Sequence, residues 1–228
     1  MNYLKELTSL ALILSSTSTF AASPFSDSPG TNHGIFHVTA KVGQTKHTNV
    51  STDPLDLVSN LSGTATSYGI NFDMSLTEYF SAGLGFVDFG EALILRDFYG
   101  EYDTGEDVIE VLESSYMFGE GITASLMLHT DPKNGPWFFF ARAGIINSEV
   151  GGKTKETYLG KVIESSMLKK ASTEQFYGVG VAYYISNTTK VGMDYNRYNM
   201  QYSIVDEDTI DKYEHDLMQT SFFISFSF

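Results

Sequence analysis

The chain has 228 residues, no cysteine and a formal net charge of −14 at pH 7. The lack of cysteine excludes a disulfide framework, and the negative charge argues against nucleic acid as a partner, because phosphates would be repelled. Beyond the N-terminal segment, no stretch reaches the roughly 18 consecutive apolar residues of a spanning helix.

The N-terminal segment has the pattern of an export signal. Lys5 supplies a cation, the apolar stretch 7–14 follows, and small residues lead to a Thr-Phe-Ala ending that fits a cleavage site. The stretch is too short to cross a bilayer as a helix. We therefore expect 1–21 to be a signal peptide, 22–33 a short periplasmic lead and 34–228 a single domain. A retained N-terminal segment is the alternative.

Eight later segments alternate large apolar residues with small or polar ones. They span 34–45, 64–75, 79–89, 115–129, 137–147, 173–185, 190–198 and 214–228. A period of two predicts strands whose two faces meet different solvents. Small residues such as glycine could not fill the core of a soluble barrel, so we expect the small and polar face to point inward and the apolar face toward lipid.

Four aromatic or acidic residues do not fit this assignment of faces. Phe140, Phe176 and Phe223 fall on the inward face, although they are large and apolar. Glu120 shares its phase with outward apolar residues, so it either lies beyond the hydrocarbon or marks a β-bulge.

The connections between the segments alternate in length. Short links at 76–78, 130–136 and 186–189 alternate with long links at 46–63, 90–114, 148–172 and 199–213. Short periplasmic turns and long extracellular loops are the layout of outer-membrane barrels. The sequence thus predicts an all-β fold, an eight-stranded antiparallel up-and-down transmembrane β-barrel with four extracellular loops.

The last strand ends on apolar residues spaced by two, Ile224, Phe226 and Phe228, which is similar to the C-terminal assembly signal of bacterial outer-membrane barrels. The chain from 34 to 228 resembles the small eight-stranded outer-membrane barrels, namely the OmpA transmembrane domain and its OmpX/Ail-like relatives. The segments FSAGLGFVDFG (80–90), WFFFARAG (137–144) and YGVGVAYY (177–184) are similar to that family's third, fifth and sixth strands. This resemblance implies the outer membrane of a Gram-negative bacterium, reached by export through the periplasm.

Four charged residues fall on the predicted inward face: Lys41, Asp73, Arg142 and Asp194. An unpaired buried charge costs several kcal/mol, so these charges should pair, with Asp73 and Asp194 as candidate partners of Arg142. The resemblance implies an internal ionic network that acts as a structural plug. A gated ion path is the alternative, although the interior of eight strands is one that side chains just fill.

The long links carry acidic side chains and one helix signal. The acidic residues are Glu91, Asp97, Glu101, Asp103, Glu106, Asp107, Glu110 and Glu113 in the second link, and Asp206, Glu207, Asp208, Asp211 and Glu214 in the fourth. We interpret them as a solvated surface, with divalent cations bridging to lipopolysaccharide as the alternative. Asp53 followed by Pro54 predicts a short helix at 53–58, which would cover the barrel mouth or form a contact surface.

Catalysis has little support in the sequence. The histidines are His33, His37, His47, His129 and His215, with no His-x-Ser and no two at metal-ligand spacing. We therefore predict no enzyme, cofactor or metal site. The expected function is structural or surface interaction, in adhesion or resistance, by a monomer. Its expected partners are outer-membrane lipid, lipopolysaccharide, the barrel-assembly machinery and a host or phage surface ligand. A small-solute channel is the alternative, followed by a lipid A-modifying enzyme.

Overall fold

The computed structural model describes residues 35–51, 61–103, 108–131, 135–158, 161–166, 170–206 and 209–228. Its strands are β1 (Phe36–Ser51), β2 (Leu61–Ser75), β3 (Phe80–Asp103), β4 (Val108–His129), β5 (Trp137–Tyr158), β6 (Lys161–Ser166), β7 (Lys170–Tyr184), β8 (Thr189–Asp206) and β9 (Thr209–Ser227). Among these residues, none forms a helix long and apolar enough to cross a membrane. The predicted signal peptide, the lead and the helix at 53–58 lie outside the described residues.

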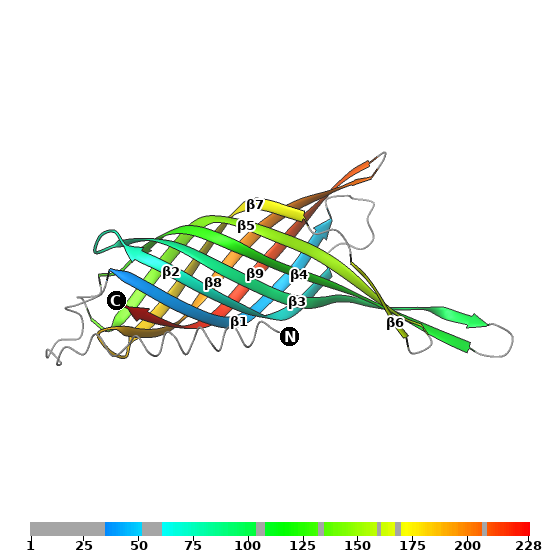
Figure 1. Ribbon diagram of the computed structural model, residues 1–228, viewed down its shortest axis with the longest axis horizontal. Coiled ribbons are helices and arrows are strands. Elements are labelled where there is room, and N and C mark those ends of the chain that lie inside the picture. The colour runs from blue at the N-terminus through cyan, green and yellow to red at the C-terminus, as the bar shows by residue number, and fades with distance from the viewer. Residues whose placement is uncertain are drawn as a thin grey trace.

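Eight of these strands close a barrel, as predicted (Figure 1). Neighbours in the order β4-β3-β2-β1-β9-β8-β7-β5 are hydrogen-bonded and antiparallel, and the pairing of β4 with β5 completes the ring. β6 pairs only with the far end of β5, from Lys153 to Tyr158, so it extends a hairpin rather than the barrel wall. The all-β, eight-stranded up-and-down fold is therefore confirmed.

The two faces of each strand also follow the prediction. On β3, Leu84 is 63% exposed on the outside, whereas Ser81 is 1% exposed on the inside. Phe140, Phe176 and Phe223 are all buried inside the barrel, which confirms their unexpected phase. An apolar outer surface around a partly polar interior is the arrangement that lipid requires, because lipid satisfies no polar groups.

Two of the three short links form tight turns, and we call this end of the barrel the turn side. At 76–79, the Thr77 hydroxyl accepts hydrogen bonds from the backbone N–H groups of Tyr79 and Phe80, at 3.2 and 3.1 Å. At 185–188, the Ser186 hydroxyl accepts from the N–H of Thr188 at 3.3 Å. Both turns use a hydroxyl residue to satisfy backbone donors that have no strand partner.

Most of the long links are not loops but extended hairpins, which corrects the sequence-based interpretation. The ladder between β3 and β4 continues to the pair Asp103–Val108, and that between β8 and β9 to Asp206–Thr209. These ladders reach far beyond the barrel wall at the end we call the hairpin side, on the right in Figure 1. The β3–β4 ladder shifts register three times, so bulges interrupt the alternation by which strands are recognised.

The first of these bulges explains Glu120. The register shifts between Asp88 and Gly90, directly beside the pair Asp88–Glu120. The Asp88 carboxylate accepts a hydrogen bond from the Gly90 N–H at 2.8 Å, and Gly90 adopts a φ of 73°, which favours glycine. Glu120 is exposed on the outer face, one outward position beyond Ile122. The position of Glu120 beside a β-bulge is therefore confirmed, and its position beyond the hydrocarbon stays a prediction.

Candidate functional site: the barrel lumen

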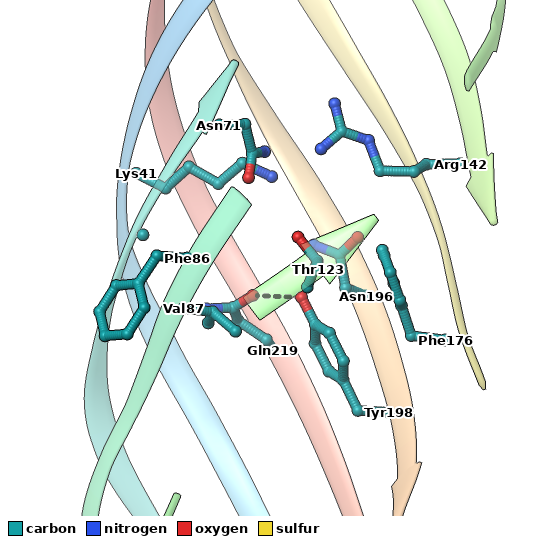
Figure 2. A pocket seen from close by; sticks show the side chains of 11 residues that line it. Lys41, Asn71, Phe86, Val87, Thr123, Arg142, Phe176, Asn196, Tyr198 and Gln219 are labelled. Carbon is teal, nitrogen blue, oxygen red and sulfur yellow. Dashed lines mark hydrogen bonds between the residues drawn. The ribbon is translucent and has the colours of Figure 1, made fainter. Parts of the chain in front are cut away.

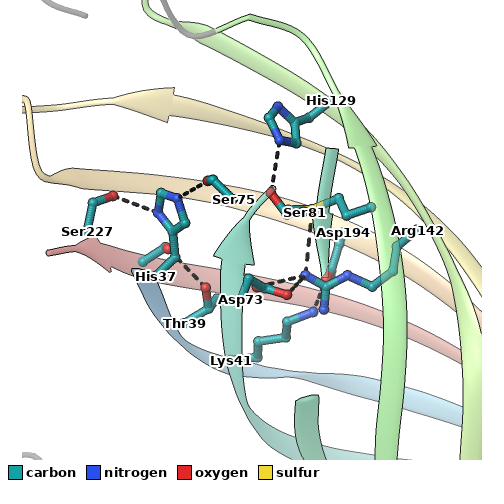
Figure 3. A network of polar contacts seen from close by, with 12 residues as sticks. His37, Thr39, Lys41, Asp73, Ser75, Ser81, His129, Arg142, Asp194 and Ser227 are labelled. Atoms are coloured by element: carbon teal, nitrogen blue, oxygen red, sulfur yellow. Dashed lines mark hydrogen bonds and ion pairs between the residues drawn. The ribbon is translucent and has the colours of Figure 1, made fainter. Parts of the chain in front are cut away.

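The four predicted inward charges meet in the middle of the lumen (Figure 3). One guanidinium nitrogen of Arg142 lies 3.0 Å from each carboxylate oxygen of Asp73. The Lys41 ammonium donates to the Asp194 carboxylate. The structure thus forms two ion pairs, from β5 to β2 and from β1 to β8, and it assigns Asp73 rather than Asp194 to Arg142.

Asn71 joins these two pairs. In the amide orientation that satisfies both of its polar atoms, its nitrogen donates to the Ile70 carbonyl at 3.1 Å. Its oxygen then accepts from Arg142 Nη1 at 2.6 Å and from Lys41 Nζ at 3.2 Å. The two cations therefore share one neutral acceptor, and the network links β1, β2, β5 and β8.

Glycines on the inward face make room for this network. A Cβ atom at Gly83 would collide with the Asp73 carboxylate, and one at Gly180 would collide with the Phe140 ring. At these two predicted inward glycines, a larger side chain would therefore displace a lumen residue.

A third cation, which was not among the predicted site residues, lies inside the barrel near the turn side. The Lys190 ammonium lies 3.9 Å from the centroid of the Phe138 ring and 5.7 Å from that of Tyr184. The side chain is buried. The sequence held the signal, because Lys190 has the same phase as Gly192 and Asp194, which were assigned to the inward face.

Apolar clusters fill the lumen on both sides of the ionic network. The turn-side cluster consists of Met127, Phe138, Phe140, Ala182, Tyr184 and Phe223. The hairpin-side cluster consists of Val87, Phe89, Ile146, Val150, Phe176, Tyr198, Met200 and Leu217.

Two small cavities lie between these groups, one of about 10 Å³, lined by residues such as Asn71 and Tyr198 (Figure 2), and one of about 20 Å³. Each has room for roughly one water molecule. Through the residues that the structure describes, side chains close the lumen.

Three inward histidines have partners that no local motif revealed. His37 Nδ1 lies 2.7 Å from the Ser227 hydroxyl and His37 Nε2 lies 3.0 Å from that of Ser75, while His129 Nε2 lies 3.0 Å from the Ser81 hydroxyl. His47 bonds the Phe89 carbonyl at 3.1 Å. The His–Ser contacts cross between strands, so a search for His-x-Ser could not find them.

The remaining histidines are His215 and His33. His215 is buried, with its ring centroid 5.3 Å from that of His47, and His33 lies outside the described residues. In the described part of the chain, no group of three or more His, Asp or Glu side chains could hold a metal ion.

The outer surface carries the other predicted residues. Ile224, Phe226 and Phe228 are all exposed on the outer face. At the hairpin side, Arg197 forms a bidentate pair with Asp216, at 3.0 and 2.8 Å. Of the acidic link residues, only Glu91 has a described side chain, and it is exposed; Glu106, Asp107, Glu207 and Asp208 lie outside the described residues.

Comparison with known proteins gives one family match. The family model for the outer membrane protein beta-barrel domain matches residues 7–226. No curated protein sequence matches the chain.

Similar solved structures include Neisserial surface protein A, at 12% identity and a TM-score of 0.46, covering 87% of this chain and 100% of that one. The outer membrane protein OprG of Pseudomonas aeruginosa has 13% identity and a TM-score of 0.49, with coverage of 89% and 99%. The attachment invasion locus protein Ail of Yersinia pestis has 14% identity and a TM-score of 0.34, with coverage of 84% and 99%.

Proposed function

The chain belongs to the outer membrane protein beta-barrel family, and we propose that it presents its long hairpins at the cell surface, in adhesion or resistance, rather than passing solutes. The observation that carries this proposal is the closed lumen. Cavities of about 10 and 20 Å³ separate two apolar clusters and an ionic network. A solute path would require several of these groups to move together, including two ion pairs.

The outer surface supports an orientation with the hairpins outside the cell. Among the side chains that the structure describes, most outward apolar residues lie near the turn side, with Leu93 as an exception, and on β4 they end between Ile122 and Glu120. The β3–β4 hairpin runs from Leu93 to Asp103 on one strand beyond this level. In the family layout, the long connections are extracellular and the short ones periplasmic. A rigid barrel would then hold the hairpins well clear of the lipid headgroups.

Shortening one hairpin at a time tests this function. Asp97 pairs with Glu113 and Ser203 pairs with Lys212, so residues 98–112 or 204–211 can each be replaced by an Asn-Gly turn without changing the register below. We expect one replacement to reduce binding to host cells or phage, or serum resistance, while heat-modifiable gel mobility stays that of a folded barrel. If both shortened proteins kept every surface phenotype, presentation would be the wrong function.

Conductance measurements test the channel alternative. We expect the purified barrel, as a monomer in planar bilayers, to show no steady single-channel current, because side chains fill its lumen. The 98–112 replacement serves as a control for blocking by the β3–β4 hairpin. Steady current in either protein would favour the channel function. Mass spectrometry of lipid A from a deletion strain checks the enzymatic alternative, for which we expect an unchanged spectrum.

Assembly through the terminal aromatic residue is a further part of this proposal. The Phe228 side chain is 50% exposed on the outside, and its backbone N–H donates to the Phe36 carbonyl at 2.9 Å. We expect Phe228→Ala to lower the folded fraction in the outer membrane more than Ser227→Ala does, because the assembly machinery reads the outward face of the last strand. Equal folded fractions, measured by heat-modifiable mobility, would contradict this role.

A further inference from the structure

The turn-side lumen holds more positive than negative charge. Among the described inward residues at this level, the cations are Lys41, Arg142 and Lys190, and the carboxylates are Asp73 and Asp194. The two carboxylates are each engaged by one cation, Asp73 by Arg142 and Asp194 by Lys41. Since burying a charge without compensation is costly, the third cation requires a counter-charge or a strongly polar partner.

Two donors in this region have no acceptor. The contacts of the Lys190 ammonium within the described residues are the ring faces of Phe138 and Tyr184. The Arg142 Nε is buried and has no hydrogen-bond partner, although the other end of its guanidinium binds Asp73. Both side chains line the same cavity of about 20 Å³. Among the described residues, the cavity therefore joins an ammonium that forms no ion pair or hydrogen bond, with Asp73 as its nearest attracting charge, to an unsatisfied N–H group.

We propose that this cavity is a binding site for a halide ion, which in the cell is chloride. A monatomic anion accepts hydrogen bonds from any direction, so it can satisfy Lys190 and Arg142 together. The cavity volume suits a single atom-sized ligand and excludes phosphate, sulfate and carboxylates. The nearby Asp194 shares its charge with Lys41 and has one buried oxygen without a donor. The Asp73 and Asp194 carboxylates also line this cavity, so the anion would have to bind on the side of Lys190 and Arg142. With one halide bound, the charges of the turn-side lumen sum to zero.

This site goes beyond surface presentation, because it assigns the lumen a ligand of its own. Its effect is on stability: an ion that binds only the folded barrel stabilises it in proportion to the logarithm of its concentration. Well above the dissociation constant, each tenfold rise in chloride should raise the ratio of folded to unfolded protein about tenfold.

The test compares unfolding of the refolded barrel in detergent micelles in sodium chloride and in sodium gluconate at equal ionic strength. We expect the urea midpoint of the wild-type protein to rise with chloride and to stay flat in gluconate. Lys190→Met should remove the chloride dependence, whatever its effect on absolute stability. Lys46→Met, the same change at an exposed outward position of β1, should retain it.

A crystallographic measurement keeps the proposal testable if Lys190→Met does not fold. Crystals of the wild-type barrel grown in sodium bromide should show an anomalous difference peak in this cavity, next to Lys190 Nζ and Arg142 Nε. A water molecule in the cavity without anomalous signal would overturn the proposal. Equal wild-type midpoints in chloride and gluconate, or an undiminished chloride dependence in Lys190→Met, would overturn it as well.

Discussion

On some strands, the polarity of the two faces reverses between the level of the ionic network and the hairpin side of the barrel. On β3, Phe86 points outward and Gly85 inward at the level of the apolar outer band. After a few more residues, Asp88 and Glu91 occupy the outer face, and Phe89, which is 0% exposed, lies inside. The hairpin side is therefore built like a small soluble barrel placed on top of a membrane barrel.

The same exchange occurs on β8. Its outer face changes from Tyr195 to Arg197, and its inner face changes from Asn196 to Tyr198 and then Met200. Alternation alone indicates only that a strand has two different sides. Which residues occupy each side indicates the solvent, lipid at one level and water at the next. The two regions should consequently depend on different forces: ion pairing beside an apolar cluster at the level of the ionic network and the turn side, and hydrophobic burial on the hairpin side.

Removing one member of an ion pair should have the largest effect on the turn side. Arg142→Ala leaves the Asp73 carboxylate buried without the guanidinium nitrogen that donates to both of its oxygens, at an expected cost of about 3–5 kcal/mol, and at the lower end if Lys190 moves toward it. The urea midpoint in micelles measures this cost. Neutralising Asp73 in the same protein, as Asp73→Asn, should restore part of the loss, whereas Asp194→Asn should not.

On the hairpin side, truncating a buried apolar side chain should cost about as much stability as breaking an ion pair does in the ionic network. Leu217→Ala removes a fully buried side chain from the hairpin-side cluster, and a cost of about 2–5 kcal/mol is expected for such a cavity. Leu93→Ala, at an outward position that is 41% exposed, should change the midpoint by no more than about 0.5 kcal/mol. Equal effects of the two changes would mean that this region has no apolar core.

A substitution in the bulge at the boundary between the two regions should have an intermediate effect on stability. In Gly90→Ala, the new Cβ would meet the Thr66 carbonyl oxygen, and the backbone would hold alanine at a positive φ. The positive φ alone costs about 1–2 kcal/mol, and the contact with the Thr66 backbone adds to this cost. Hydrogen exchange should localise the change to the β2–β3–β4 amides beyond Asp88. Protection that is lost evenly around the barrel would contradict a local role for the bulge.

The exposed ion pair on the outer surface should have the smallest effect. Arg197→Ala breaks a bidentate pair in which the Arg197 side chain is 41% exposed, so solvent screening limits the loss to about 1 kcal/mol or less. The difference from wild type should shrink further as salt is raised. A loss as large as that of Arg142→Ala would show that burial does not distinguish the two pairs.

The sequence was sufficient to predict the eight barrel strands and their faces, because lipid on one side and a packed lumen on the other impose a strict alternation. It did not predict the hairpin extensions. There, water can meet the outer face, residues such as Gly90 accommodate bulges, and the phase of the apolar positions shifts. The strict alternation is therefore a property of the lipid-facing part only.

The lumen charges could be found from the sequence, but their partners could not. Asp73 and Asp194 were equivalent candidates for Arg142. The phase of a strand determines which face a residue occupies, but it does not determine the position of that residue along the barrel axis. The register between strands settles this, since it is fixed by the turns and by closure of the ring. Lys190 was missed although its phase pointed inward, and so the surplus of lumen cations was missed with it.

The ladder between β1 and β9 closes the ring by pairing the first strand of the chain with the last one. It brings together residues as distant as His37 and Ser227, 190 positions apart, and β9 also pairs with β8 along its other edge. Contacts of such high sequence separation form late. Until β9 docks, β1 and β8 remain open edges that can pair with another chain or be cleaved by a protease. Docking of β9 between β1 and β8 thus removes both of these open edges.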